Sequence, residues 1–124
     1  MKAVALVALG SAIGGACRYG SQVFVAKYYL NTFPLATFLV NVLGCFCIGV
    51  FYALSEKENL LSADWRLFLT TGLCGGFTTF SAFAYENLNL LRSADYTYFA
   101  LYTAASVVAG IFAVYAGIFL MKFF

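Results

Sequence analysis

Charged residues divide this chain into four long apolar stretches, and this division constrains the possible folds more than any other feature of the sequence. Three stretches contain no charged side chain and the fourth contains one arginine; they comprise residues 28–55, 67–85, 96–121 and 3–26. A helix needs about 20 apolar residues to cross the hydrocarbon core of a membrane, which is roughly 30 Å thick. We therefore predict an all-α membrane protein with four transmembrane helices. The expected spans lie at about 3–28, 33–54, 66–91 and 96–121, within a single domain over residues 1–124.

The composition supports this prediction and excludes several other classes of protein. Hydrophobic residues make up 64% of the 124 residues and charged residues only 10%, against about 25% charged residues in an average soluble domain. A soluble domain of this size cannot bury so much apolar surface. The scattered basic residues and the net charge of +2 give no footprint for nucleic acid. Because histidine is absent and no catalytic or zinc-binding motif is present, we do not expect an enzyme.

The basic residues near the ends of the spans leave the orientation of the chain in the membrane open. Four spans place both termini on one side, and Lys and Arg in the loops normally mark the cytoplasmic side. The side of the termini has four basic residues and the other has three; they are Lys2, Lys57, Arg66 and Lys122 against Lys27, Arg92 and Arg18. Either this statistical rule does not resolve the chain, or the protein inserts in both orientations and forms an antiparallel dual-topology homodimer.

The third span contains a pattern that predicts a broken helix near residues 75–79. Gly75 and Gly76 are adjacent in mid-span, and Thr78 and Thr79 follow them. Each glycine weakens a helix by about 1 kcal/mol relative to alanine, and threonine side chains compete for backbone hydrogen bonds. Carbonyl groups freed within a membrane need a partner, which a cation, ordered water or a second subunit could provide. The alternative is that the glycines serve close packing between helices.

Few polar side chains lie inside the spans, so each is a candidate for function. Asn41 lies in the middle of the second span, where its amide either forms an interhelical hydrogen bond or lines a polar path. In the fourth span Tyr102, Ser106 and Gly110 recur every four residues, which fits a polar path or plain packing. A second stripe of small residues predicts a packing surface; it consists of Ala105, Ala109, Ala113 and Gly117.

Two phenylalanines and two charged residues are further candidates. Phe80 and Phe83 are three residues apart and therefore share a helix face, close to Ser81. A phenyl ring has a positive edge, so this face is a candidate contact for an anion. Arg18 and Glu86 lie inside or near spans, where a charge is a functional candidate by default unless it reaches the membrane interface.

Three segments of the sequence resemble a known family. They are Gly14-Gly15-Ala16-Cys17-Arg18-Tyr19, Ala36-Thr37-Phe38-Leu39-Val40-Asn41-Val42-Leu43-Gly44, and Gly72 to Phe83. The last segment has the specific pattern G-x-x-G-G-x-T-T-F-S-x-F, and the second contains T-x-x-V-N. These motifs are similar to those of the CrcB/Fluc family of fluoride channels, and the similarity extends over essentially the whole chain.

The resemblance implies a passive channel that exports cytoplasmic fluoride across the plasma (inner) membrane of a prokaryote. It implies an antiparallel dual-topology homodimer in lipid, with a structural sodium ion held by backbone carbonyls of Gly75 and Thr78. The fluoride pore of the family corresponds here to Asn41, Phe80, Phe83, Ser81, Tyr102 and Ser106. The supporting positions correspond to Arg18, Thr37 and Glu86. Ala82 and Gly110 stand where some members carry a hydroxyl, which affects the outer part of the polar track.

The main alternative is a small multidrug or guanidinium exporter, which also has four spans and often inserts in both orientations. Proton-coupled exchange requires a carboxylate deep in the membrane. The first span contains none, and Glu86 lies late in the third span, so the fluoride channel is the preferred hypothesis. A membrane subunit without transport activity would explain the packing stripe but not the combination of Asn41 with the T-T-F-S-x-F face.

Overall fold

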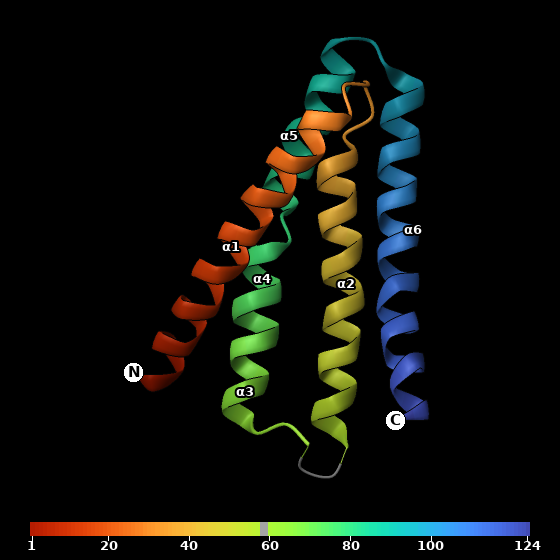
Figure 1. Cartoon of the computed structure of the whole chain (residues 1–124). Helices are drawn as coiled ribbons and strands as arrows, with labels where there is room; N and C mark the ends of the chain where they lie inside the picture. Colours follow the sequence, from red (N-terminus) through yellow and green to blue (C-terminus); the bar gives the residue numbers. More distant parts are fainter. Residues whose placement is uncertain (58–59) are drawn as a thin grey trace.

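The computed structural model describes residues 1–57 and 60–124, and within these ranges all regular structure is helical. Figure 1 shows the elements in chain order. They are α1 (Lys2–Tyr28), α2 (Leu35–Glu56), α3 (Ala63–Leu67), the π-helical segment η1 (Phe68–Cys74), α4 (Gly75–Phe77), α5 (Phe80–Arg92), α6 (Tyr96–Leu120) and the short 3-10 helix η2 (Met121–Phe123). For the described residues, the predicted all-α fold is confirmed.

Four helical segments in the described part of the chain are long and apolar enough to cross a membrane. They are Lys2–Tyr28, Leu35–Glu56, Ala63–Arg92 and Tyr96–Phe123. This number agrees with the prediction, and each end lies within three residues of the expected one. Both termini lie toward the same end of the molecule (Figure 1), as an even number of spans requires. The expected polar loop over residues 55–65 includes residues 58 and 59, which lie outside the described residues.

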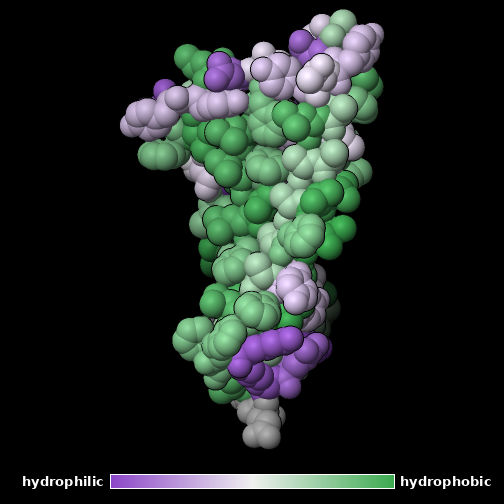
Figure 2. Space-filling view, turned by 90° about the vertical axis from the view of Figure 1, so that its right-hand side faces the viewer, coloured by the Kyte–Doolittle hydropathy of each residue, from purple (hydrophilic) through white to green (hydrophobic). Residues whose placement is uncertain are grey.

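The surface of the molecule fits a chain that crosses a lipid bilayer. In Figure 2, apolar residues cover the middle of the visible face, and hydrophilic residues gather toward its two ends. Large apolar side chains of α6 are exposed in the single chain, among them Ile111 and Phe112. Exposed apolar surface of this extent is suited to contact with lipid or with another apolar surface.

Glycine residues allow α2 and α6 to approach one another closely. A Cβ atom at Gly49 on α2 would lie 2.2 Å from the carbonyl oxygen of Val114, and one at Gly117 on α6 would lie 2.3 Å from that of Phe46. The two helices therefore pack backbone against backbone, and they lie side by side in Figure 1. Small residues serve this purpose in membrane helices, where dispersion contacts replace the hydrophobic effect.

Gly14→Ala is expected to lower the stability of the protein by about 1–3 kcal/mol, the usual cost of overpacking. α1 crosses the third span at this glycine, and a Cβ atom there would lie 2.2 Å from the carbonyl oxygen of Leu73. Gly15→Ala is the matched control, because a Cβ atom at Gly15 meets no atom within 4 Å. Thermal unfolding in detergent measures both variants, and equal transition temperatures would contradict the close packing of α1.

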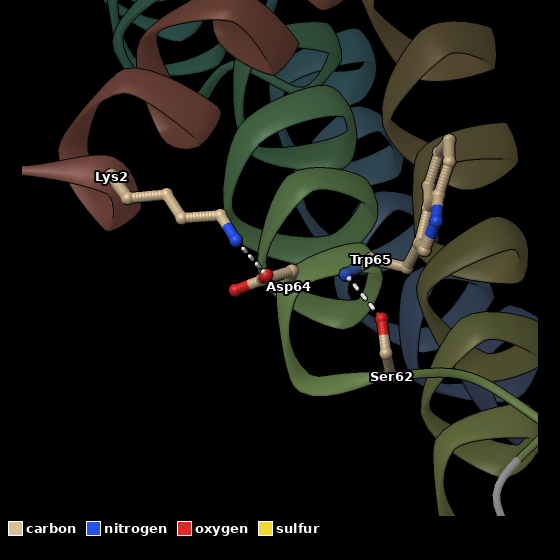
Figure 3. A network of polar contacts seen from close by, with 4 residues as sticks. All are labelled: Lys2, Ser62, Asp64 and Trp65. Carbon is tan, nitrogen blue, oxygen red and sulfur yellow. Dashed lines mark hydrogen bonds and ion pairs between the residues drawn. The ribbon is translucent and has the colours of Figure 1, made fainter.

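An ion pair connects the N-terminus with the start of the third span, where a side-chain cap begins α3 (Figure 3). Lys2 Nζ lies 2.8 Å from Asp64 Oδ2. The backbone N–H of Trp65 donates a hydrogen bond of 3.2 Å to Ser62 Oγ, which caps α3. Because both members of the ion pair are exposed, the pair contributes little to stability.

The third span changes its backbone conformation between α4 and α5. Thr78 and Thr79 are extended, with φ −87° and ψ 159° at the first and φ −150° and ψ 116° at the second. The hydroxyl of Thr79 accepts a hydrogen bond of 3.2 Å from the backbone N–H of Ala82 and so caps α5. Both threonines fall within residues 75–79, the region that the glycine and threonine pattern singles out.

Candidate functional site

A groove lies beside the two extended threonines and is formed by α2, the start of α5 and α6. Its volume is about 310 Å³. The residues that line it are Asn41, Gly44, Cys45, Ile48, Thr78, Thr79, Phe80, Phe83, Ser106 and Val107. Four of the predicted pore residues therefore meet in one place, namely Asn41, Phe80, Phe83 and Ser106.

Asn41 joins α2 to the extended segment through both ends of its amide. Its Oδ1 atom accepts a hydrogen bond of 2.8 Å from the backbone N–H of Thr79. Its Nδ2 atom donates one of 3.1 Å to the carbonyl oxygen of the same residue. The amide nitrogen carries two hydrogens, so one of them stays available to another acceptor. Asn41 thus forms the hydrogen bond between spans that was one of the two alternatives, and it also lines the groove.

Aromatic side chains form one wall of the groove. The rings of Phe80 and Phe83 have their centroids 5.7 Å apart at an interplanar angle of 42°. Phe83 also packs on Tyr102, with a centroid distance of 5.0 Å. Phe80 is 78% exposed in the single chain, so this wall is open on one side.

Ser106 supplies an unused hydroxyl to the same groove. Its Oγ atom is buried and has no hydrogen-bond partner among the described residues. A buried polar group without a partner costs roughly 1–3 kcal/mol. A ligand that accepts a hydrogen bond would therefore be stabilised at this position.

A second polar cluster surrounds Glu86, one turn beyond Phe83 on α5. Glu86 Oε2 accepts a hydrogen bond of 2.8 Å from the hydroxyl of Thr37, and Oε1 accepts one of 2.9 Å from the hydroxyl of Tyr102. Gln22 Nε2 lies 3.5 Å from Thr37 Oγ1 and donates to it. Thr37 and Tyr102 are the largest fully buried side chains among the described residues. None of these four residues lines the groove, but the ring of Tyr102 packs on Phe83 and so connects the cluster to the groove wall.

The other predicted site residues lie around the extended segment. Arg18 on α1 donates a hydrogen bond of 3.2 Å from Nε to the carbonyl oxygen of Gly76. Ser81 is exposed, and its Oγ lies 3.3 Å from Thr79 Oγ1. Neither of these side chains lines the groove. Gly75 and Thr78 belong to the same stretch of backbone, and Gly75 is exposed in the single chain.

Comparison with known proteins identifies the family. The family of CrcB-like proteins (Camphor Resistance, CrcB) matches residues 5–118, which is most of the chain. This chain belongs to the CrcB family. The resemblance inferred from the sequence motifs is thereby confirmed.

Similar members of the CrcB family are named as channels and not as enzymes. The fluoride-specific ion channel FluC of Flavobacterium psychrophilum is 43% identical over 122 residues, covering 98% of each chain. The FluC proteins of Phocaeicola vulgatus and Methylobacillus flagellatus are 46% and 47% identical over 122 and 123 residues. These matches cover 98% of this chain and 100% and 96% of the relatives. The matches therefore extend over nearly the whole chain, and no span lies outside them.

One residue of the cluster around Glu86 in this CrcB chain, Gln22, was not predicted from the sequence. Gln22 contacts Thr37 across two spans, and no motif pointed to it. The available signal was its amide inside an apolar stretch, the same signal that drew attention to Asn41. The grouping of Thr37, Glu86 and Tyr102 was also not predicted, because it depends on how three separate helices are rotated.

Tyr102→Phe is expected to destabilise this CrcB protein by about 1–3 kcal/mol, since it removes a donor from the half-buried carboxyl group of Glu86. The phenyl ring that packs on Phe83 is retained, so the groove wall stays in place. Tyr98→Phe serves as the control, because Tyr98 lies on the same helix but is 39% exposed. Thermal unfolding in detergent compares the two variants. A loss of stability that is equal in both would contradict the proposed importance of the buried hydrogen bond.

Proposed function

We propose that this protein is a fluoride-selective channel that lets cytoplasmic fluoride leave the cell passively. The observation that carries the proposal is the groove in which Asn41, Phe80, Phe83 and Ser106 meet beside the extended threonines. The names of the CrcB relatives, which are fluoride-specific ion channels, support the same substrate. The functional unit is a single four-span membrane domain over residues 1–124.

The chemistry of the groove suits a small, strongly hydrated anion. A selective pore must replace the water around the ion with other donors. Asn41 retains one amide hydrogen, and the Ser106 hydroxyl has no partner among the described residues. The positive ring edges of Phe80 and Phe83 add weak contacts with an anion. Ser81 and Tyr102 lie next to this wall and extend the proposed polar track.

We propose that two copies of the chain form an antiparallel dual-topology homodimer. The open wall at Phe80, which is 78% exposed, needs another surface to exclude lipid from the pore. Basic residues are nearly balanced between the two ends of the spans, as insertion in both orientations requires. A second, inverted copy would close the groove without an inverted repeat in the sequence.

A structural sodium ion at the centre of this dimer is the second part of the proposal. The residues fit such an ion, because the backbone N–H groups that would serve Gly75 and Thr78 in a continuous helix are used elsewhere: Thr79 N–H bonds Asn41 and Ala82 N–H bonds Thr79 Oγ1. Backbone carbonyl oxygens can replace the hydration shell of an alkali cation. The described residues contain no group of acidic, cysteine or histidine side chains that could hold a metal. When bound, the ion would contribute a fixed positive field that favours an anion.

Export would follow from the chemistry of the ion and the membrane potential. Hydrogen fluoride crosses membranes uncharged and ionises inside the cell, and an inside-negative potential then drives the anion out through a channel in the plasma membrane. Both oxygens of Glu86 are occupied by hydroxyl donors. This arrangement does not suit a carboxylate that exchanges substrate for protons, so it favours the channel over a multidrug exporter.

Growth of a fluoride-sensitive bacterium tests the proposed role in cells. Cells that express this chain are expected to grow at fluoride concentrations that stop growth of the empty-vector strain. Expression of a matched amount of the Phe83→Ile variant is expected to give weaker rescue than the wild type. Equal sensitivity of all three strains, with the protein present in the membrane fraction, would contradict the proposal.

Ser106→Ala is expected to lower fluoride flux about 3- to 10-fold, equivalent to roughly 0.7–1.4 kcal/mol in the barrier. The variant removes a donor from the groove, and it also relieves the cost of an unpartnered buried hydroxyl. Its stability should therefore stay the same or rise while flux falls. Ser93→Ala, at an exposed position after α5, is the control in liposome flux assays. Unchanged flux in Ser106→Ala would remove this hydroxyl from the pore.

A further inference from the structure

The extended segment of the third span has its carbonyl groups divided into two sets. Gly76 and Thr79 have carbonyl oxygens that accept hydrogen bonds from side chains of other helices, 3.2 Å from Arg18 Nε and 3.1 Å from Asn41 Nδ2. Gly75 and Thr78 have carbonyl oxygens that lose their helical donors. The donor for Gly75 in a continuous helix would be the N–H of Thr79, the fourth residue along the chain.

The backbone N–H of Thr79 donates to Asn41 instead of to Gly75. The Oδ1 atom of Asn41 accepts the N–H of Thr79 at 2.8 Å, while its Nδ2 atom holds the carbonyl oxygen of the same residue. The amide therefore pairs with Thr79 as a neighbouring strand would, which keeps this residue extended. If Thr79 returned to helical geometry, its N–H would bond Gly75 and remove that carbonyl from other ligands.

A close contact from the same helix face fixes the preceding residue. Gly44 packs directly against the side chain of Thr78, since a Cβ atom at Gly44 would be 2.2 Å from Thr78 Cγ2. The hydroxyl of Thr78 donates a hydrogen bond of 2.9 Å to the carbonyl oxygen of Cys74. The Thr78 side chain is thus restrained from two sides. α2 therefore contacts both threonines, Thr78 through Gly44 and Thr79 through Asn41.

We infer that Asn41 is a positioning residue for the cation site as well as a lining residue of the anion groove. By holding Thr79 extended, it leaves the carbonyls of Gly75 and Thr78 available to a cation. One side chain then connects the two sites, so the occupancy of the cation site and the shape of the groove change together. This inference rests on the sodium site of the proposed function.

Sodium-dependent thermal stabilisation of the purified full-length protein tests the inference independently of flux. Unfolding is followed across a range of sodium concentrations, with N-methylglucamine as the replacement cation. The wild type is expected to be stabilised by sodium, and Asn41→Ala is expected to need at least about tenfold more sodium for half of the effect. Asn87→Ala is the matched control, because Asn87 is a buried amide whose Oδ1 accepts from Thr103 on α6, away from the extended segment. Its sodium midpoint should stay at the wild-type value.

Amide hydrogen exchange at Thr79 provides a second readout. Asn41→Asp is a second variant for the case that Asn41→Ala folds poorly. Asn41→Asp keeps an acceptor for the Thr79 N–H, so protection of this amide should persist, whereas Asn41→Ala should speed its exchange at least about tenfold. Unchanged protection of the Thr79 amide and an unchanged sodium midpoint in Asn41→Ala would overturn this inference but not the proposed sodium site. If the wild type shows no stabilisation by sodium while it still transports fluoride, the proposed sodium site itself is overturned.

Discussion

Phe83→Ile is expected to lower fluoride flux by about 10- to 100-fold, which corresponds to roughly 1.4–2.7 kcal/mol in the barrier. Phe83 lines the groove and lies between Phe80 and the ring of Tyr102. Isoleucine is apolar but lacks the positive ring edge that can contact an anion. The loss therefore concerns the contact with the ion more than the packing of the helix. Efflux from liposomes measures the effect at equal protein content.

Two controls separate a pore effect from a folding effect for Phe83→Ile. Phe112→Ile changes the same type of residue on α6, at a side chain that is 66% exposed and outside the groove, and its flux should match the wild type. Size-exclusion chromatography in detergent should show the same elution for all three proteins. Wild-type flux in Phe83→Ile would exclude this ring from the anion path.

Gly44→Ala is expected to lower flux at least about tenfold and to destabilise the protein by about 1–3 kcal/mol. A Cβ atom at this position would lie 2.2 Å from Thr78 Cγ2. The threonine side chain is short and its hydroxyl is bonded to Cys74, so it cannot move away without shifting the extended segment. Because Gly44 and Thr78 both line the groove, this shift changes the proposed anion path and the proposed cation site together.

Gly110→Ala is the matched control for this substitution. Gly110 on α6 faces the same region of α2, but a Cβ atom there would lie 3.5 Å from Cys45 Sγ, which is an ordinary van der Waals contact. Flux and unfolding temperature are measured for both variants in the same lipid and detergent. Equal flux and equal unfolding temperatures in the two variants would contradict a specific role of the close contact between Gly44 and Thr78.

Much of the fold could be predicted because the membrane limits the choices. Charges mark the ends of the spans, and only helices satisfy the backbone of a chain that crosses lipid. The adjacent Gly75 and Gly76 with the following threonines drew attention to the segment that is extended. The π-helical geometry of η1 was not predicted, since no residue type specifies it reliably.

The candidate site could be predicted only in part, and the reason is geometric. The helix period places Asn41 and Gly44 on one face of the second span, and Phe80 and Phe83 on one face of the third span. The family motifs led us to expect that these two faces meet at one site. The contacts of Asn41 with Thr79 and of Gln22 with Thr37 depend on the rotation of one helix against another. A one-dimensional pattern does not contain that rotation.

Fluoride efflux from liposomes tests the central claim most directly. Purified protein is reconstituted, the vesicles are loaded with potassium fluoride and potassium chloride, and ion-selective electrodes follow both anions after a potassium ionophore is added. We predict rapid release of fluoride that needs the ionophore but no proton or sodium gradient, with chloride retained. No release of fluoride by correctly reconstituted protein, or release of chloride at the same rate, would contradict the account.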